Sequence, residues 1–418
     1  MSQYLVVPDP ASLDLTRSGL AFGVPFETAT SVQQVLDLRR EVLERFAGSL
    51  LASRAGVAAG AGAGAVGEGG AIEVLAGVGA LLVDSDVVDL EAARASLGLR
   101  IIENREIRRI QPERDGSVET ADPSLFWHLE HIHVAAARAK RLHGRGVLVG
   151  VLDTGVEYGH SEFAGKAVAA YQEFDSLGRR VPGPARDPAG HGTHVCGLIA
   201  GRQAGIAPGA DLAVAAVLTK PTVSGWAGDV PQIVKGLEWL LTTPFRGAGH
   251  PPGVDVLNGS FGESPYDAFL YPMLAPARLW WGDLMVAAIG NDGYRGAGHH
   301  SSPANYDIVV GVGAVDRHDV HWLGSGWGAV PQHPGIAKPE LSAPGVRVYS
   351  ASPRIGYFTR ETGTSVASPI VAGAAALLIE QQPARATNGA ALWGALLSLV
   401  RPSGDPRVGR GILDLANI

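Results

Sequence analysis

Near-continuous runs of hydrophobic residues recur through the C-terminal two thirds of the chain. The runs read VLVGVLDTG (147–155), DLAVAAVL, VDVLNGSFG, LMVAAIGND and IVVGVGAV. Such runs are typical of parallel strands that are covered on both faces, and helical stretches such as 230–241 lie between them. This alternation predicts an α/β fold, a doubly wound and mostly parallel sheet flanked by helices, over residues 123–418. In such sheets ligand groups lie just beyond the carboxyl ends of the strands, so the polar residues that end these runs are candidates for a site.

The pattern before residue 123 is different. Residues 30–55 have apolar positions at helical spacing, and the Gly-rich stretch 60–70 follows. This stretch contains a G-x-G-x-x-G match, but no strand precedes it, so a flexible linker is the better interpretation. Residues 71–110 predict a small α+β unit with strands AIEVLA, GALLV, LRIIE and EIRRI and a helix over 86–97. An exposed loop is expected over 111–123. These segments suggest an N-terminal extension (1–70), a small domain (71–122) and a large domain (123–418).

Composition narrows the function further. The 418 residues are 46% hydrophobic and 18% charged, with a net charge of −7, which argues against a general attraction to nucleic acid or to an anionic membrane. One cysteine excludes an internal disulfide framework. No apolar run reaches the ~18 residues of a membrane helix, and the first 15 residues do not read as a secretory signal peptide. We therefore expect a protein that is cytoplasmic, or exported by a route without such a signal.

Four polar residues form a candidate catalytic set. Asp153 and Asn291 end two of these runs, while His191 and Ser365 lie where apolar helical stretches begin. A serine hydroxyl becomes a good nucleophile when a histidine takes its proton. A carboxylate then orients the imidazole, and an amide donor can stabilise the oxyanion. Singly, each residue has an ordinary explanation, such as a strand-to-turn signal for Asp153 or a helix N-cap for Ser365. Their occurrence in the order Asp–His–Ser favours the catalytic interpretation.

The segments VLDTGV, GHGTHVCG, NGSFG, AAIGNDG and GTSVASPIVAGAAALL resemble the signature blocks of subtilisin-like serine proteases. The resemblance covers about residues 124–418 and implies a serine endopeptidase that acts through an acyl-enzyme on protein or peptide substrates. It implies that Asp153 is the triad carboxylate, His191 the general base, Ser365 the nucleophile and Asn291 the side chain of the oxyanion hole. It also implies two sets of substrate-binding residues: a strand that pairs with the substrate (Ser260, Phe261, Gly262) and the wall of the pocket for the residue before the cut (Ala288, Ile289, Gly290). Ser301 or Ser302 is expected at the bottom of that pocket.

Residues 71–110 resemble the inhibitory prodomain of secreted subtilisins, a small ferredoxin-like fold. The resemblance implies a self-processing zymogen whose own prodomain is an intramolecular inhibitor, with cleavage between about 111 and 123. The alternative is a permanent regulatory domain. Residues 1–70 have no counterpart in this resemblance.

A metal site is the competing chemical interpretation. Two groups could supply ligands: His191, His194 and Cys196, and His128, His131 and His133. Neither has the spacing of a zinc site, so we expect no metal and no cofactor. The segment GLIAGRQAGIAPGADL is shorter than the calcium-binding loop found in many family members, so no calcium site of that type is expected, while calcium elsewhere stays open. Two other functions also stay open: a narrow processing protease for one partner protein, and a catalytically silent binding protein on the same fold.

Overall fold

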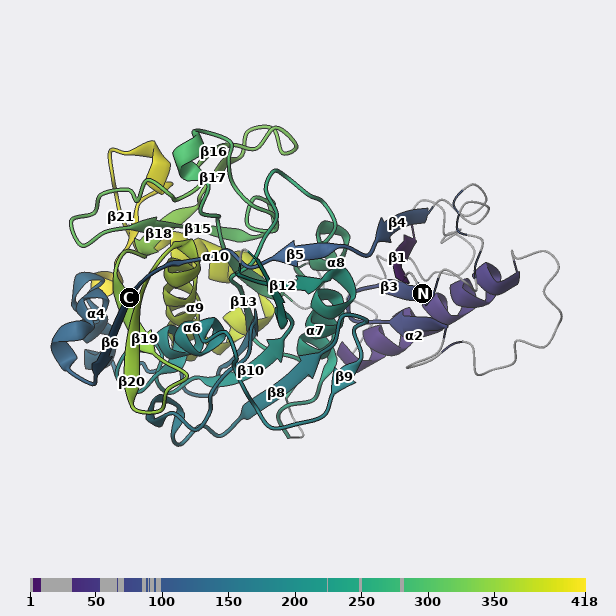
Figure 1. Ribbon diagram of the computed structural model, residues 1–418, viewed down its shortest axis with the longest axis horizontal. Helices are drawn as coiled ribbons and strands as arrows, with labels where there is room; N and C mark the ends of the chain where they lie inside the picture. The colour runs from purple at the N-terminus through teal and green to yellow at the C-terminus, as the bar shows by residue number, and fades with distance from the viewer. Residues whose placement is uncertain are drawn as a thin grey trace.

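The computed structural model describes residues 3–8, 32–52, 66, 71–84, 88, 90, 94, 99–223, 225–247, 250–278 and 282–418. Figure 1 shows a large body that carries most of the chain and a small unit at one side, formed by N-terminal residues. The two parts are joined by an extended segment that crosses the large body.

A ten-stranded sheet, counted within the described residues, forms the centre of the large body. Its order is β21-β22-β18-β15-β14-β13-β7-β10-β8-β9. The central pairs are parallel, and antiparallel pairs occur at both edges. The predicted mostly parallel sheet is therefore confirmed. The strands are β7 (Leu148–Asp153), β8 (Ala169–Phe174), β9 (Arg180–Val181), β10 (Asp211–Ala216), β13 (Val256–Gly259), β14 (Leu284–Ala288), β15 (Val310–Val315), β18 (Leu341–Pro344), β21 (Val400–Arg401) and β22 (Ile412–Leu413).

Helices cover both faces of this sheet. Along β7, Val149 and Val151 pack into one hydrophobic cluster, while Leu148 and Leu152 pack into another, as the alternation of side chains along a strand requires. The first cluster includes α6 (His191–Ala200), α9 (Thr364–Gln381) and α10 (Gly389–Ser398), and the second includes α7 (Val230–Thr242) and α8 (Tyr271–Pro276). The shorter helices are α4 (Trp127–His131), α5 (Val134–Ala139) and the 3-10 turns η1 (Pro123–Leu125), η2 (Ser161–Phe163), η4 (Gly293–Arg295), η5 (Pro383–Thr387), η6 (Pro406–Val408) and η7 (Leu415–Asn417).

Helix α9 is long and apolar enough to cross a membrane by length and composition. However, 89% of it is buried inside the protein, where it packs on the central strands. This burial is what the core helix of a doubly wound sheet requires.

The small unit contains a four-stranded sheet in the order β2-β3-β1-β4. Its strands are β1 (Gln3–Pro8), β2 (Ile72–Leu75), β3 (Ala80–Asp84) and β4 (Leu99–Glu103). Helix α2 (Val32–Ala52) packs on this sheet through Leu43, Phe46 and Leu50. Because β1 pairs with both β3 and β4, the sheet runs across the boundary expected at residue 70. Most of the expected helix 86–97, and all of the Gly-rich linker except Val66, lie outside the described residues.

The segment after β4 differs from the sequence-based expectation. Strand β5 (Glu106–Arg108) leaves the small sheet and pairs with β12 (Gly225–Asp229), which also pairs with β11 (Lys220–Thr222). The exposed loop expected over 111–123 is largely a strand, β6 (Glu113–Thr120). Its side chains are exposed, but its backbone pairs with β20. The remaining strands are β16 (Gly328–Ala329), β17 (Ala337–Lys338), β19 (Val348–Ala351) and β20 (Tyr357–Thr362).

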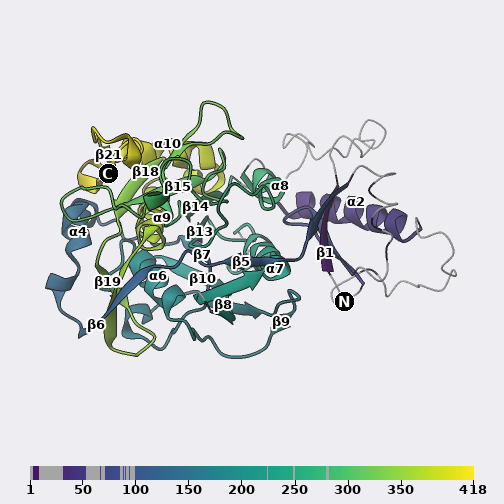
Figure 2. The ribbon, with the colours of Figure 1, turned by 45° about the horizontal axis from the view of Figure 1, so that its top comes forward.

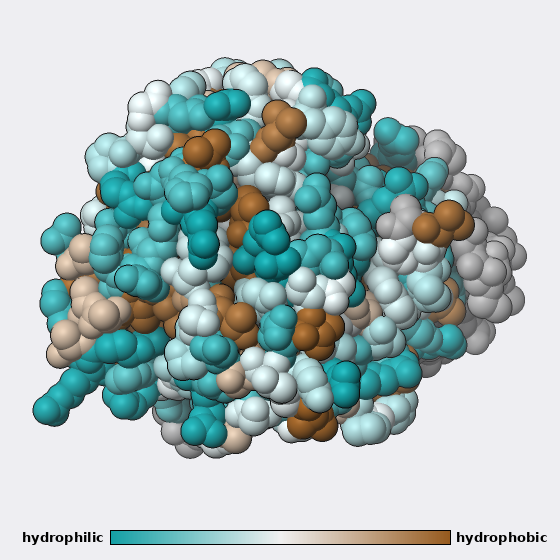
Figure 3. Space-filling model, turned by 60° about the vertical axis from the view of Figure 1, so that its left-hand side comes forward, coloured by the Kyte–Doolittle hydropathy of each residue, from teal (hydrophilic) through white to brown (hydrophobic). Residues whose placement is uncertain are grey.

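The small unit contacts helix α7 of the large body. The carboxylate of Glu238 accepts hydrogen bonds from the backbone N–H groups of Gly77 (3.0 Å) and Val78 (2.8 Å). An ion pair joins Lys235 on the same helix to Glu73. Figure 2 shows the result: the small unit lies beside α7, and β5 runs from it across the large body. The face in Figure 3 mixes hydrophilic residues with scattered hydrophobic ones.

Candidate active site

Asp153 and His191 meet beyond the carboxyl end of β7. Asp153 is the last residue of that strand, and His191 is the first residue of α6. The imidazole Nδ1 lies 2.7 Å from Oδ1 of Asp153, and both side chains are fully buried. The same oxygen accepts the N–H of Thr154 at 2.7 Å. The carboxylate of Asp153 thus fixes the imidazole through Nδ1. The other ring nitrogen, Nε2, makes no contact with Asp153.

Asp187, which sequence reasoning missed, ties these two elements together. Its Oδ1 accepts from the hydroxyl of Thr154 (2.8 Å) and from the N–H groups of Ala189 (3.3 Å) and Gly190 (2.9 Å). Its Oδ2 accepts from both the N–H (2.8 Å) and the hydroxyl (2.7 Å) of Thr193. The buried carboxylate therefore fixes the first turn of α6 against the end of β7. Nothing in the sequence RDPAGHGTH marks Asp187 beyond its position four residues before the histidine.

Ser365 is the second residue of α9, and its side chain is fully buried. Within the described residues, neither Oγ of Ser365 nor Nε2 of His191 has a hydrogen-bond partner. Both are therefore free to bond to each other or to a substrate; such bonds often form only in the complex. Ser260 directly follows β13, and its hydroxyl donates to the carbonyl of Ser365 at 3.3 Å.

Asn291 lies next to the start of α9. Its Oδ1 accepts from the N–H (3.0 Å) and the hydroxyl (2.8 Å) of Thr364, the residue before Ser365. These two contacts direct the amide Nδ2 away from the helix, where it can donate to an oxygen at the nucleophile. This is the arrangement that an oxyanion hole requires.

The predicted pocket wall lies at the end of β14. Ala288 and Ile289 are fully buried, and Gly290 has a φ of +109°. A Cβ at Gly290 would lie 2.5 Å from Oγ of Ser301, so glycine is needed there for space as well as for backbone conformation. Of the two serines expected at the bottom of the pocket, Ser301 is the one that faces Gly290.

Ile110 enters the same pocket from the segment that follows the small unit. A Cβ at Gly262 would lie 2.9 Å from Cβ of Ser301 and 3.4 Å from Cδ1 of Ile110. Ile110 is buried there. The predicted pocket residues therefore surround the side chain of Ile110, which belongs to the protein itself.

The backbone around Ile110 is bound as an added strand. The N–H of Arg109 donates to the carbonyl of Trp226 (3.0 Å), and the N–H of Gly262 donates to the carbonyl of Arg108 (3.1 Å). Phe261 forms an antiparallel bridge with Arg109. Beyond it, Nδ2 of Asn291 donates to the carbonyl oxygen of Gln111 at 2.8 Å. The chain thus passes between both walls of the groove and puts a carbonyl on the predicted oxyanion donor.

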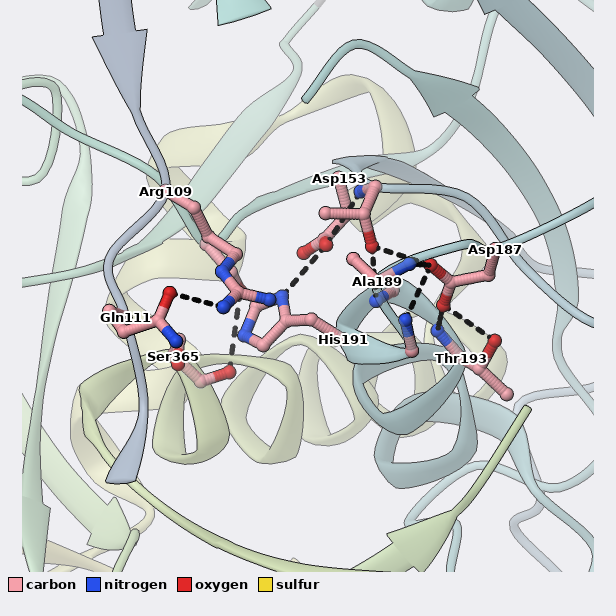
Figure 4. Close-up of polar contacts among 12 residues, drawn as sticks. Arg109, Gln111, Asp153, Asp187, Ala189, His191, Thr193 and Ser365 are labelled. Carbon is pink, nitrogen blue, oxygen red and sulfur yellow. Dashed lines mark hydrogen bonds and ion pairs between the residues drawn. The ribbon is translucent and has the colours of Figure 1, made fainter. Parts of the chain in front are cut away.

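The side chain of Arg109 is buried beside the Asp153–His191 pair, as Figure 4 shows. Its guanidinium donates to the side chain of Gln111, and two of its nitrogens have no partner among the described residues. Burial lowers the pKa of Arg109, and the negative charge of Asp153 opposes that shift. The site therefore holds a cation next to the imidazole.

The histidines of the metal interpretation have other partners. His194 Nε2 lies 3.2 Å from the carbonyl of Val348, and His128 Nε2 lies 2.9 Å from the carbonyl of Ala204. Cys196 packs in the core, where burial raises the pKa of its thiol. Among the residues that the structure describes, no three His, Cys, Asp or Glu side chains are grouped to hold a metal ion.

Comparison with known proteins gives an independent result. Residues 144–398 match the model of the subtilase family. "Alkaline protease" of Alkalihalobacillus alcalophilus is 37% identical over 278 residues, which cover 65% of this chain and 64% of that protein. "Subtilisin Savinase" of Lederbergia lenta is 37% identical over 267 residues (62% and 86%), and "Subtilisin-like protease PopC" of Myxococcus xanthus is 35% identical over 266 residues (58% and 54%). The chain thus spans less than two thirds of the length of the first and third of these relatives.

Proposed function

Because this chain belongs to the subtilase family, we propose that it is a subtilisin-like serine endopeptidase that hydrolyses peptide bonds through an acyl-enzyme. The observation that carries the proposal is the Asp153–His191 contact of 2.7 Å beside Ser365, with a peptide carbonyl already bound by Asn291. The substrates that we expect for this chain are proteins or peptides.

The geometry supports a defined role for each residue. Nε2 of His191 takes the proton of Ser365 as Oγ attacks the carbonyl carbon, and later delivers it to the leaving amine. Asp153 holds Nδ1 and stabilises the imidazolium that forms. Asn291 donates to the oxyanion, together with N–H groups at the start of α9. The substrate binds as an extended strand between Trp226 and Gly262, by the main-chain contacts that the protein's own segment makes.

We propose further that the intact chain is a self-inhibited zymogen. The segment from Glu106 to Gln111 fills the groove, and the small unit holds it there through contacts with α7. The carbonyl of Gln111 is bound by Asn291, so the Gln111–Pro112 bond is the one we expect the enzyme to cut. Cleavage on the C-terminal side of Gln111, before Pro112, falls within the range 111–123 expected from the sequence. Ile110, which fills the pocket expected for the residue before the cut, is then the second residue before it.

The decisive experiment combines labelling with processing. A fluorophosphonate probe should label the wild-type protein at Ser365, and the Ser365→Ala variant should remain unlabelled and intact. Sequencing of the mature N-terminus should give Pro112. Absence of labelling at Ser365 after processing would refute the endopeptidase proposal. Full activity in a protein that still begins at Met1 would refute the zymogen proposal and leave the endopeptidase intact.

A further inference from the structure

Glu361 is a buried carboxylate close to the nucleophile. It lies on β20, four residues before Ser365, and its side chain has no exposed surface. Neither of its oxygens has an aligned hydrogen bond among the described residues. A buried carboxylate is costly unless a cation or strong donors compensate it, so its environment must contain such a group.

That group is the guanidinium of Arg114 on β6. Nε of Arg114 lies 2.6 Å from Oε1 of Glu361, and the two residues are direct partners in the β6–β20 register. Nη1 of Arg114 also donates to the carbonyl of Ala189 at 3.1 Å. Ala189 lies two residues before His191. The guanidinium therefore bridges the strand that leads to the nucleophile and the loop that leads to the general base.

Arg114 lies on β6, directly beyond the segment that fills the groove. It follows Gln111, whose carbonyl is bound by Asn291, by three residues. Cleavage after Gln111 leaves Arg114 near the new N-terminus. For a substrate to bind here, β6 must separate from β20, so that Arg114 leaves while Glu361 stays on β20 in the wall of the groove. His194 does not compensate the charge, because burial lowers the pKa of that imidazole.

On the basis of the proposed function, we propose that Glu361 forms a substrate subsite for arginine on the leaving-group side of the cut. The arginine is the third residue after the one whose carbonyl Asn291 binds. A guanidinium suits the subsite because it presents several donors in a fixed fork, and here it must reach a carboxylate and a carbonyl in different directions. The enzyme thus prefers substrates that carry a positive charge at the third residue after the cleaved bond.

The test uses the self-processed protein and matched internally quenched peptides. The peptides differ only at the third residue after the cleaved bond, which is arginine, its neutral analogue citrulline, or glutamate; mass spectrometry checks the cut. The wild type should cleave the arginine peptide with a kcat/KM about 10 to 100 times that for citrulline, which corresponds to one charge-assisted hydrogen-bonded pair. The glutamate peptide should be the poorest. Equal rates for arginine and citrulline would overturn the proposal.

Variants assign the preference to Glu361. In Glu361→Gln the arginine-to-citrulline ratio should fall to about one. Glu380→Gln is the matched control, since Glu380 is a largely buried carboxylate at the far end of α9 that accepts from the N–H groups of His143 and Gly144; its ratio should equal that of the wild type. A ratio that survives in Glu361→Gln would refute the assignment.

A short peptide anilide separates failure of this subsite from failure of the proposed function. The anilide has no residues after the cleaved bond, so it does not reach Glu361. The processed wild type should hydrolyse it, and titration with a fluorophosphonate shows separately that Glu361→Gln is folded. If the processed wild type does not hydrolyse the anilide or any peptide, the endopeptidase proposal itself fails.

Discussion

Asp187 does not touch the substrate, but we expect it to position the catalytic residues. Its carboxylate accepts five hydrogen bonds, and these connect Thr154, beside Asp153, to Thr193, two residues after His191. In Asp187→Asn one oxygen becomes an NH₂ group. The hydroxyl of Thr193 can rotate to accept from that group, but a backbone N–H loses its acceptor, and the other bonds lose their ionic component. At 1.5–3 kcal/mol for a bond to a charged group, we expect a loss of about 3 kcal/mol in the free energy of unfolding.

The catalytic effect follows from geometry. A displacement of about 1 Å between the end of β7 and the first turn of α6 is enough to lower kcat by 10- to 100-fold. KM should change little, because the groove is formed by other strands. Stability is measured by urea unfolding in the Ser365→Ala background, which prevents self-digestion. The value of kcat is measured per active site titrated with a fluorophosphonate.

Asp175→Asn is the matched control. Asp175 caps a turn by accepting from the N–H groups of Leu177 and Arg179, but it lies outside the site. It should change kcat by less than twofold. The reasoning would be wrong if Asp187→Asn lost the expected stability but kept kcat per titrated site within twofold of the wild type. That result would make Asp187 a support of the fold alone.

Two further predictions concern the oxyanion donor and a buried histidine. Asn291→Ala should lower kcat by about 10²–10³ with a small change in KM, in steady-state assays with a peptide substrate; an unchanged kcat would exclude Asn291 from the oxyanion hole. Burial lowers the pKa of His128 to about 4, so the unfolded state binds the proton first. The resulting stability is complete above pH 6.5 and is lost as the pH falls towards 4, by up to about 3 kcal/mol. In Ser365→Ala protein, urea unfolding at several pH values should show a weaker pH dependence for His128→Gln, and no such change for His318→Gln at an exposed position.

The parallel sheet and the ends of its strands could be predicted because their determinants are local. A strand buried on both faces has to be a near-continuous apolar run, and the polar residue that ends it stands out. Asp153 and Asn291 were found in this way, each directly after its run. The α/β fold then brings such residues to one edge of the sheet, where His191 and Ser365 begin the helices that follow.

Other parts of the molecule have no comparable local signal in the sequence. Strand β1 joins the small sheet from a position more than 60 residues before β2. No local pattern indicates which strands it pairs with. Asp187 is one aspartate among the polar residues of a loop. Strand β6 reads as a loop because its sequence ERDGSVET has turn-forming residues and exposed side chains, while its stability comes from backbone pairing with β20.

The contacts of the segment that fills the groove could not be predicted from the residue pattern, although the family resemblance implied an inhibitory role for the domain before it. A groove that binds peptides by backbone N–H and C=O groups accepts any extended chain that reaches it, so the strand from Arg108 to Gln111 needs no particular side chains for most of its contacts. The exceptions are positions where the groove supplies a pocket or a charge. Ile110 enters the pocket at Ser301, and Arg114 meets the buried carboxylate of Glu361. If the strand is an inhibitor that imitates substrate, these two side chains are the ones through which the groove distinguishes one peptide from another.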